Sequence, residues 1–491
     1  MVSYSYNEQT EFLFEVIFYL RGGTHVKIRK WMFKRGINKA PLNPDFIKYV
    51  ENIKQEQDHQ TGKIPYREYI PPPVNLSYLT GKKVFPHLRG TALPSSFDLR
   101  KEGRVTSVKN EGPAGTAWAF AAYGSLESCL LPGHKWNFSE NNMKNLLSEE
   151  CSEGFDRPSN GPGNFLMSTA YLARWSGPVL EKDDPYDPNS PGNCIEMSPR
   201  RHLRKVIFIP ARNSYTDNRN IKLAIMKYGA VATAIYFDEV YYNNNHSFYC
   251  EDWKLSFNHA VCLVGWDDNY DRRKFKNLPP GPGVFIAKNC WGTNWGDNGY
   301  FYISYYDQMV GRDNALFSRV MNPNTYNVIY EYDPLGWCDS AGANSTTAWF
   351  ANMFTSTSEQ ELRAVSWYVA SPGSSYNLYL YTNPTNSDPR SGKLVKTLNG
   401  KVLEPSYYQK TFSTPVKLTN GQKFSVVVEA TTPGWDWPVP LQMRIEGYSS
   451  KARSKPGQGF LSMDGESWLD VTEVFENASV CLKAFASTSD R

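Results

Sequence analysis

The chain has 491 residues, which is enough for two to four domains of roughly 100–200 residues each. Apolar residues make up 41% of it and charged residues 21%, so a sizeable core can form and global disorder is excluded. Lysine and arginine number 53 against 49 aspartate and glutamate, an excess too slight for a protein that neutralises nucleic-acid phosphates. Seven histidines and eight cysteines, without a CxxC or HExxH motif, argue against a zinc-built fold, and we expect no cofactor and no metal.

Residues 1–39 are an apolar and then basic head of unknown role. The most apolar run in this head, residues 12–20, contains Glu15 and follows acidic rather than basic residues, which makes a poor signal peptide. Between Lys27 and Lys39 six basic residues occur without an acidic one, a pattern that fits a solvated helix face, an anionic-surface contact or an atypical translation start. No run of about 18 apolar residues occurs, so no transmembrane helix is expected.

Residues 40–92 combine a predicted short helix with an extended connector. The helix is predicted near the start of this region, and three consecutive prolines follow at Pro71–Pro73. Three prolines in a row cannot lie inside a helix or a central strand. The sequence therefore predicts a connector that lies along another part of the molecule.

Residues 323–491 have the pattern of an all-β domain. Short alternating runs are separated by Pro, Gly, Asn and Ser, and their spacing predicts an antiparallel β-sandwich. The clearest predicted strands are Ala364–Ala370, Tyr376–Thr382 and Phe424–Ala430, with a turn at Asn420–Gly421.

Residues 93–322 contain the motifs that carry chemistry. A glycine-containing turn after Gly112 is followed by an apolar segment with helical spacing from Trp118 onward. The turn places positions 116–118 at a helix N-terminus, where the helix dipole lowers the pKa of a cysteine thiol. Positions 114 and 117 are both alanine in this chain.

Two further motifs supply a histidine and an asparagine. His259 begins the apolar run HAVCLVGW, and Asn289 ends a short apolar run before Trp291 and Trp295. In a thiol protease the histidine accepts the thiol proton, the asparagine fixes the imidazole tautomer, and a tryptophan shields their hydrogen bond from water. His259 lies 142 residues after Ala117, within the roughly 130–150 residues typical of that chemistry, and the insertion at residues 267–283 separates it from Asn289.

Six ordered blocks over residues 93–320 resemble the papain-like cysteine peptidase family. The resemblance implies an α+β domain with a helical half, a β-rich half and a cleft between them. Residues 40–92 resemble the pro-segment of bacterial and archaeal members, and residues 323–491 resemble their lectin-like β-sandwich. The blocks are LPSSFDLR, the turn and helix at 105–128, FSENNMKNLLSEEC, IKLAIMKYGAVATAIY, NHAVCLVGW and KNCWGTNWGDNGYFYISY.

The chain departs from this family at its catalytic positions. Ala117 stands where the family has its nucleophilic cysteine, and a methyl group cannot attack a carbonyl. Glu111 stands where the family has the glutamine of the oxyanion hole, and an ionised carboxylate there repels the developing oxyanion. Ala114 stands where many members have the cysteine that pairs with the position of Cys151.

Two explanations of Ala117 remain open. It is either an engineered replacement in an active peptidase or a natural feature of an inactive homologue, and the joint loss at position 111 favours the second. His259, Asn289 and Trp291 remain in place. We therefore predict a papain-like domain that is catalytically dead as written, with a natural pseudopeptidase that binds peptides or glycans, or supports an assembly, as the alternative.

The predicted partners follow from the same resemblance. Gly161, Gly163 and Asn258 are expected to line a peptide cleft, and the loop with Trp435 and Trp437 is expected to be exposed and to stack on sugars. The resemblance implies an extracellular or cell-surface location.

Overall fold

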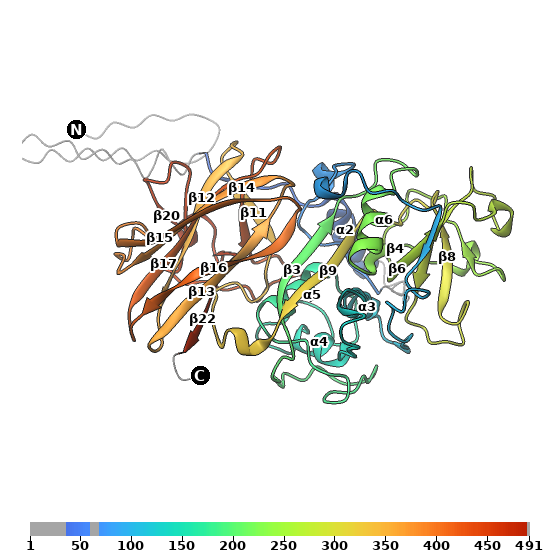
Figure 1. The fold of residues 1–491 in the computed structure, drawn as a ribbon, viewed down its shortest axis with the longest axis horizontal. Coiled ribbons are helices and arrows are strands. Elements are labelled where there is room, and N and C mark those ends of the chain that lie inside the picture. The colour runs from blue at the N-terminus through green and yellow to red at the C-terminus, as the bar shows by residue number, and fades with distance from the viewer. Residues whose placement is uncertain (1–35, 59–67, 489–491) are drawn as a thin grey trace, which may run out of the picture.

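We describe the fold from a computed structural model, in which residues 36–58 and 68–488 are described. The apolar and basic head up to residue 35 lies outside the described residues. A helical half and a β-rich half lie on one side of the molecule, and a β-sandwich lies on the other (Figure 1). The helices are α2 (Pro44–Asp58), α3 (Ala117–Leu130), α4 (Glu140–Leu146), α5 (Phe165–Ala173), α6 (Arg219–Lys227) and α7 (Val471–Val474). None of the described helices combines the length and the apolar character needed to cross a bilayer.

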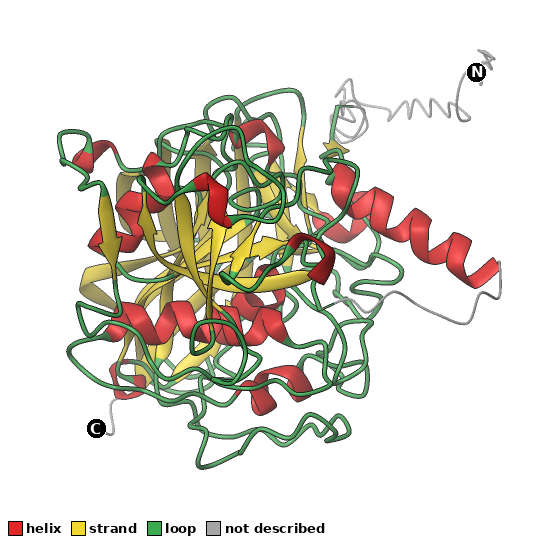
Figure 2. Ribbon diagram, turned by 90° about the vertical axis from the view of Figure 1, so that its right-hand side faces the viewer, coloured by secondary structure: helices red, strands yellow, loops and turns green. Residues whose placement is uncertain are grey.

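One long sheet runs through both parts of the molecule. It joins the two at strands β16 and β3, where Tyr407 pairs with Val206. Figure 2 shows strands in the middle of the molecule with helices and loops around them. The sheet order is β10 (Val328–Tyr330), β22 (Leu482–Thr488), β13 (Gln360–Val369), β16 (Ser406–Leu418), β3 (His202–Ile209), β9 (Asn314–Met321), β4 (Val231–Ile235), β6 (His259–Asp267), β7 (Val284–Lys288), β8 (Tyr300–Ser304) and β5 (Ser247–Phe248), with β2 (Ser96–Asp98) beside β6.

The sandwich encloses its own apolar core. Residues alternate along β14, so that Tyr376, Leu378 and Leu380 point inward, as expected for a strand with one face on a core. A six-stranded sheet forms one layer, and the end of the long sheet forms the other. The six strands are β15 (Lys393–Val402), β14 (Ser374–Thr382), β17 (Lys423–Thr431), β12 (Thr347–Thr355), β19 (Gly459–Ser462) and β20 (Leu469–Asp470). The predicted sandwich and its three clearest strands are confirmed.

The central helix α3 is buried on all sides from Ala117 to Ser128. Its alanines and glycine allow close packing: a Cβ at Gly124 would lie 2.7 Å from the Sγ atom of Cys262 on β6. Because Gly124 has no Cβ atom, strand β6, which carries His259, lies directly against helix α3, whose first residue is Ala117. The fold therefore brings the two motifs together through small side chains in the helix.

The segment before residue 93 packs against both parts of the molecule. Strand β1 (Asn38–Lys39) pairs with β11 (Asp339–Gly342) in a four-stranded sheet with β18 (Val439–Gln442) and β21 (Ser479–Val480). In α2, the ring of Phe46 meets Tyr448 edge-on with centroids 5.6 Å apart. Tyr78 stacks on Trp435 with centroids 3.9 Å apart. The predicted connector itself lies along the other half of the molecule, because residues 68–74 are all buried and the N–H groups of Glu68 and Ile70 donate to Asn258 and Gly163.

A disulfide bond links Cys151 to Cys194 across 43 residues of sequence. The sequence left Cys151 without the partner expected at position 114, and spacing alone does not identify Cys194. The bond closes a segment on the helical half that begins after α4, contains α5 and ends before β3. Cross-linking a loop of this length restricts the unfolded chain and thereby stabilises the folded one.

We expect the double variant Cys151→Ser with Cys194→Ser to lose about 2–4 kcal/mol in its free energy of unfolding, because the unfolded chain regains the entropy of the open loop. Urea denaturation of the two proteins measures the difference. Adding a reductant should destabilise the parent protein and leave the double variant unchanged. Equal stability of parent and variant would contradict the expectation.

Candidate functional site

Ala117 is the first residue of α3 and is fully buried. The predicted helix N-terminus at this position is confirmed. The adjacent hydroxyl of Thr116 is already engaged, because its Oγ1 atom lies 2.7 Å from the hydroxyl oxygen of Tyr186. The head of the helix thus offers its positive dipole end but no nucleophile.

His259 and Asn289 form the predicted hydrogen bond. His259 begins β6, and Asn289 directly follows β7, the strand paired with β6. Asn289 Oδ1 accepts the backbone N–H of Cys290 at 2.9 Å and lies 2.8 Å from His259 Nε2, so this ring nitrogen carries a proton. The ring of Trp291 stacks on the imidazole with centroids 4.6 Å apart. The prediction that His259 and Asn289 pair beneath Trp291 is confirmed.

Glu111 is fully buried, and its carboxylate accepts four hydrogen bonds. Oε2 accepts from the backbone N–H of Thr116 at 2.8 Å and from its hydroxyl at 3.4 Å. Oε1 accepts from Trp291 Nε1 at 2.9 Å and from the Cys290 thiol at 3.1 Å. Burial, followed by the charge of Glu68, raises the pKa of Glu111 from 4.5 to about 8. The site therefore contains an acid that titrates near neutral pH at the position assigned to the oxyanion hole.

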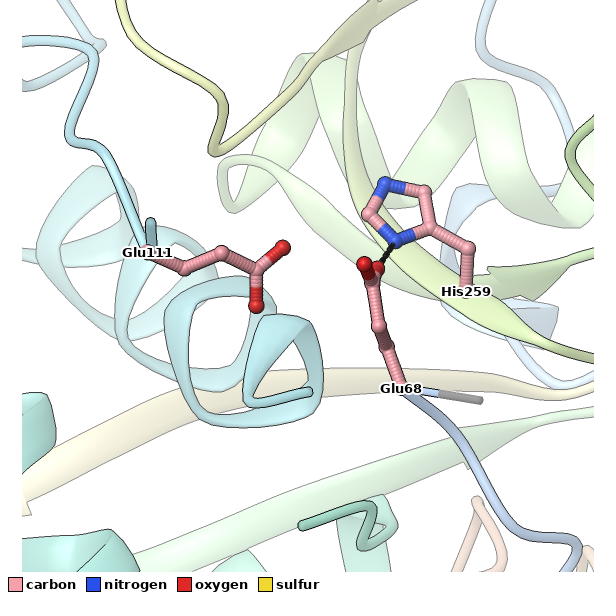
Figure 3. Close-up of side chains that lie close together, drawn as sticks. All are labelled: Glu68, Glu111 and His259. Carbon is pink, nitrogen blue, oxygen red and sulfur yellow. Dashed lines mark hydrogen bonds and ion pairs between the residues drawn. The ribbon is translucent and has the colours of Figure 1, made fainter. Parts of the chain in front are cut away.

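Glu68 is the site residue that sequence reasoning missed. Its carboxylate contacts His259 Nδ1 (Figure 3), whereas Asn289 contacts the other ring nitrogen, Nε2. Glu68 lies at the start of the predicted connector and is 3% exposed. The available signal was one acidic residue immediately before the proline-rich run, but nothing in the sequence indicated which buried group it would meet.

Two of the three predicted cleft residues, Asn258 and Gly163, contact the connector through their backbone. The carbonyl oxygen of Asn258 accepts the N–H of Glu68 at 2.7 Å, and that of Gly163 accepts the N–H of Ile70 at 3.0 Å. Gly161 acts differently, because its carbonyl accepts from Trp118 Nε1 at 3.3 Å within the domain. The cleft is thus filled by residues of the chain itself.

The electrostatics of the site favour a charged imidazole. Burial by itself lowers the pKa of His259, but the carboxylates of Glu68 and Glu111 outweigh it and raise the pKa above 6.5. The hydrogen bonds of His259 also favour the protonated ring. With Nε2–H donated to Asn289, a neutral ring would turn the lone pair of Nδ1 toward the Glu68 carboxylate, and the two would repel. Protonation of Nδ1 makes the contact attractive.

Glu68, Glu111 and His259 bring together three groups of the kind that bind metal ions. One ligand atom each from Glu68, Glu111 and His259 lie within 4.8 Å of one another, and all three residues are buried. Carboxylate and imidazole groups suit several divalent metals. Both Glu111 oxygens, however, already accept hydrogen bonds from Thr116, Trp291 and Cys290, and a cation would have to displace these donors. We therefore interpret Glu68, Glu111 and His259 as a group that binds protons and not as a metal site.

The tryptophan loop differs from its prediction. Trp435 is 6% exposed because Tyr78 covers it, so the expectation of an exposed loop is wrong for this residue. Trp437 is half-buried, and its Nε1 atom donates to Asn38 Oδ1 at 2.5 Å. Both rings face the segment before residue 93 because that segment crosses the sandwich at this point.

Comparison with known proteins identifies the two domains. Residues 93–320 match the profile of the papain family cysteine proteases, and residues 329–486 match that of the lectin-like domain. The chain therefore carries a papain-family cysteine protease domain followed by a lectin-like domain.

Relatives and solved structures agree with this assignment. A viral cathepsin of Bombyx mori nuclear polyhedrosis virus is 34% identical over 231 residues, which cover 46% of this chain and 65% of the relative. A probable cysteine protease of Arabidopsis thaliana is 29% identical over 233 residues, which cover 46% of this chain and 62% of the relative. The matches thus span somewhat less than two thirds of these relatives.

The crystal structure of the cysteine protease and lectin-like domains of Cwp84, a surface layer associated protein of Clostridium difficile, superposes with a TM-score of 0.78 at 23% identity. It covers 92% of this chain and 99% of that one. A form of the same protease with alanine in place of a cysteine, after propeptide cleavage, gives a TM-score of 0.71 at 23% identity and covers 81% of this chain and all of that one. These structures share the fold of the present chain.

We expect the free energy of unfolding to fall as the pH rises from about 4.5 to about 8. The folded protein holds the proton of Glu111 more tightly than the unfolded chain does, so this contribution is present below pH 4.5 and is lost as the pH approaches 8. Urea denaturation across this range should show a smaller fall in Glu111→Gln than in the parent. The exposed Glu102→Gln is the matched control and should keep the parent's slope. An unchanged slope in Glu111→Gln would contradict the assignment.

Proposed function

We propose that this chain binds peptide in the cleft of its papain-family domain and does not hydrolyse it. The observation that carries the proposal is Ala117 at the head of α3, because a methyl group has no lone pair with which to attack a carbonyl. Cys290 is no substitute, since its thiol donates to Glu111 and burial raises its pKa well above 9.0. A thiol held in that form is a poor nucleophile.

The surroundings of Glu111 support a natural rather than an engineered loss. Its carboxylate accepts four donors, including the indole of Trp291, so the neighbouring groups suit an acid at this position. A single cysteine replacement in an active enzyme would leave a glutamine here. The two departures together fit a protein that no longer performs acyl transfer.

A second candidate is an active peptidase whose cysteine has been replaced. The pairing of His259 with Asn289 beneath Trp291 favours it, because this arrangement orients an imidazole for general base catalysis. The coding sequence at position 117 separates the candidates: a cysteine codon in the natural gene restores the peptidase, and an alanine codon supports the binding protein.

The proposed location is the cell surface. The support is the shared two-domain fold with a surface layer associated protein of Clostridium difficile. The lectin-like domain supports a carbohydrate partner at that surface, and the papain-family domain supports a peptide or protein partner. Trp435 and Trp437 remain the proposed sugar contacts only if the segment that covers them moves away.

We expect the chain as written to release no product from unstructured protein substrates or fluorogenic peptides, because position 117 lacks a thiol. A fluorescence assay at several pH values checks this. Hydrolysis that a thiol alkylator abolishes would contradict the proposal and assign catalysis to another cysteine.

We expect Ala117→Cys to hydrolyse peptide more slowly than Ala117→Cys with Glu111→Gln. Above about pH 8 an ionised Glu111 repels the oxyanion, and removing one oxyanion donor typically costs about 10²–10³ in rate. The advantage of the double variant should shrink below about pH 8, as Glu111 takes up its proton. The ratio of the two rates is the measurement, since both variants hold the same connector in the cleft. A ratio near one at every pH would show that Glu111 does not face the reacting carbonyl.

A further inference from the structure

The connector from Glu68 to Val74 occupies the cleft as a peptide ligand would. All of its residues are buried. Its backbone is held from both walls: Glu68 donates to Asn258 on the β-rich side, and Ile70 donates to Gly163 on the helical side. Tyr69 also forms a parallel β-bridge with Gly163. Such main-chain pairing supports affinity, whereas side-chain pockets supply specificity.

The second residue of the connector fills an aromatic pocket with a polar end. Tyr69 is fully buried, and its ring lies 5.1 Å from that of Phe165 and 6.0 Å from that of Phe257. Its hydroxyl donates to Asp313 Oδ2 at 2.7 Å. A phenol satisfies both the apolar walls and this acceptor, so the pocket selects tyrosine over smaller or purely apolar side chains.

The prolines suit the buried path that follows. Proline has no N–H group, so residues 71–73 bring no backbone donor into the interior that would need a partner. Two of their carbonyl oxygens are satisfied by Asn43, which donates from Nδ2 to Pro72 and from its backbone N–H to Pro73, both at 2.9 Å.

The first residue of the connector meets the charged end of the site. In an active thiol protease the imidazolium faces a thiolate, but Ala117 provides no anion here. The carboxylate of Glu68 contacts Nδ1 of the imidazole and supplies that charge instead (Figure 3). His259 thereby changes from a proton acceptor in catalysis to a cation that binds a carboxylate.

We propose that the cleft is a receptor for peptides of the pattern acidic–aromatic–aliphatic–proline, in which protonated His259 binds the acidic side chain, and that residues 68–74 are the ligand it holds in the present state. This proposal rests on the proposed function, because a peptide that stays bound must not be cleaved. It adds the ligand class and the group that recognises it.

The charge of His259 depends on the titratable side chains that surround its ring. Glu68 approaches from the connector, and Glu111 approaches from the turn before α3. The thiol of Cys290 contacts Glu111 from the loop after β7. Both carboxyl groups favour the protonated ring when they are ionised, so the contact between Glu68 and His259 weakens as the pH rises past the pKa of His259, which lies above 6.5.

Amide hydrogen exchange of the full chain tests the contact between Glu68 and His259 within the protein itself. We expect the amides of Tyr69 and Ile70 to exchange about tenfold faster in Glu68→Gln than in the parent near pH 6, since one charged pair is lost. After correction for intrinsic rates, the parent should approach the variant as the pH rises past the pKa of His259, which lies above 6.5. The control Glu51→Gln removes an exposed carboxylate from α2 and should exchange like the parent. Equal protection in Glu68→Gln and the parent would overturn the proposal.

A peptide added in trans tests the recognition rule. The full-length variant Glu68→Gln with Tyr69→Ala weakens the internal ligand, and circular dichroism checks its fold. It should bind the labelled heptapeptide EYIPPPV about tenfold more tightly than QYIPPPV near pH 6, and the preference should decline as the pH rises past the pKa of His259, which lies above 6.5. Equal binding of the two peptides would overturn the proposal, as would a preference that appears only with added zinc. If the variant misfolds, the exchange experiment decides alone.

The outcome also separates this proposal from the proposed function. Cleavage of the heptapeptide would refute the non-hydrolytic function. Binding without cleavage and without preference for the acidic residue would refute only the recognition rule. Replacing His259 by Gln in the weakened variant should abolish the preference while tyrosine-dependent binding remains.

Discussion

The buried contact between the carboxylate of Glu68 and the imidazole of His259 joins three parts of the chain that are distant in sequence. It fixes the connector in the cleft, gives the imidazole its charge and brings a second carboxylate, Glu111, under the influence of the first. A carboxylate and an imidazole buried together stabilise a structure only when each is the other's partner, because an uncompensated buried charge is strongly unfavourable. The cleft and the segment before it therefore depend on each other.

The segment before residue 93 is also held by the sandwich. Strand β1 pairs with β11, Phe46 packs on Tyr448, and Tyr78 stacks on Trp435. The two domains share a continuous sheet through β3 and β16. The segment before residue 93 therefore contacts both domains, with its connector in the cleft and β1, Phe46 and Tyr78 against the sandwich.

The chemistry of the site follows from the groups around Ala117, where a cysteine peptidase would have its thiol. The helix N-terminus, the imidazole and its asparagine remain, and these groups together favour an anion. With no thiolate at Ala117, a carboxylate from the connector takes the role of that anion. The proposed change from catalysis to recognition therefore needs few new residues. The cleft already binds extended backbone, and the main addition is an acidic residue, Glu68, ahead of the prolines.

The sequence by itself determined the architecture and most of the site. Alternating runs predicted the sandwich, the prolines predicted an extended connector, and the protease-like motifs around His259 and Asn289 predicted their hydrogen bond, because each is a local pattern or an ordered motif. Tertiary structure alone decided the partner of Cys151, the burial of Trp435 and the contact of Glu68 with His259. These three depend on which distant segments meet, and no periodicity within a segment records that.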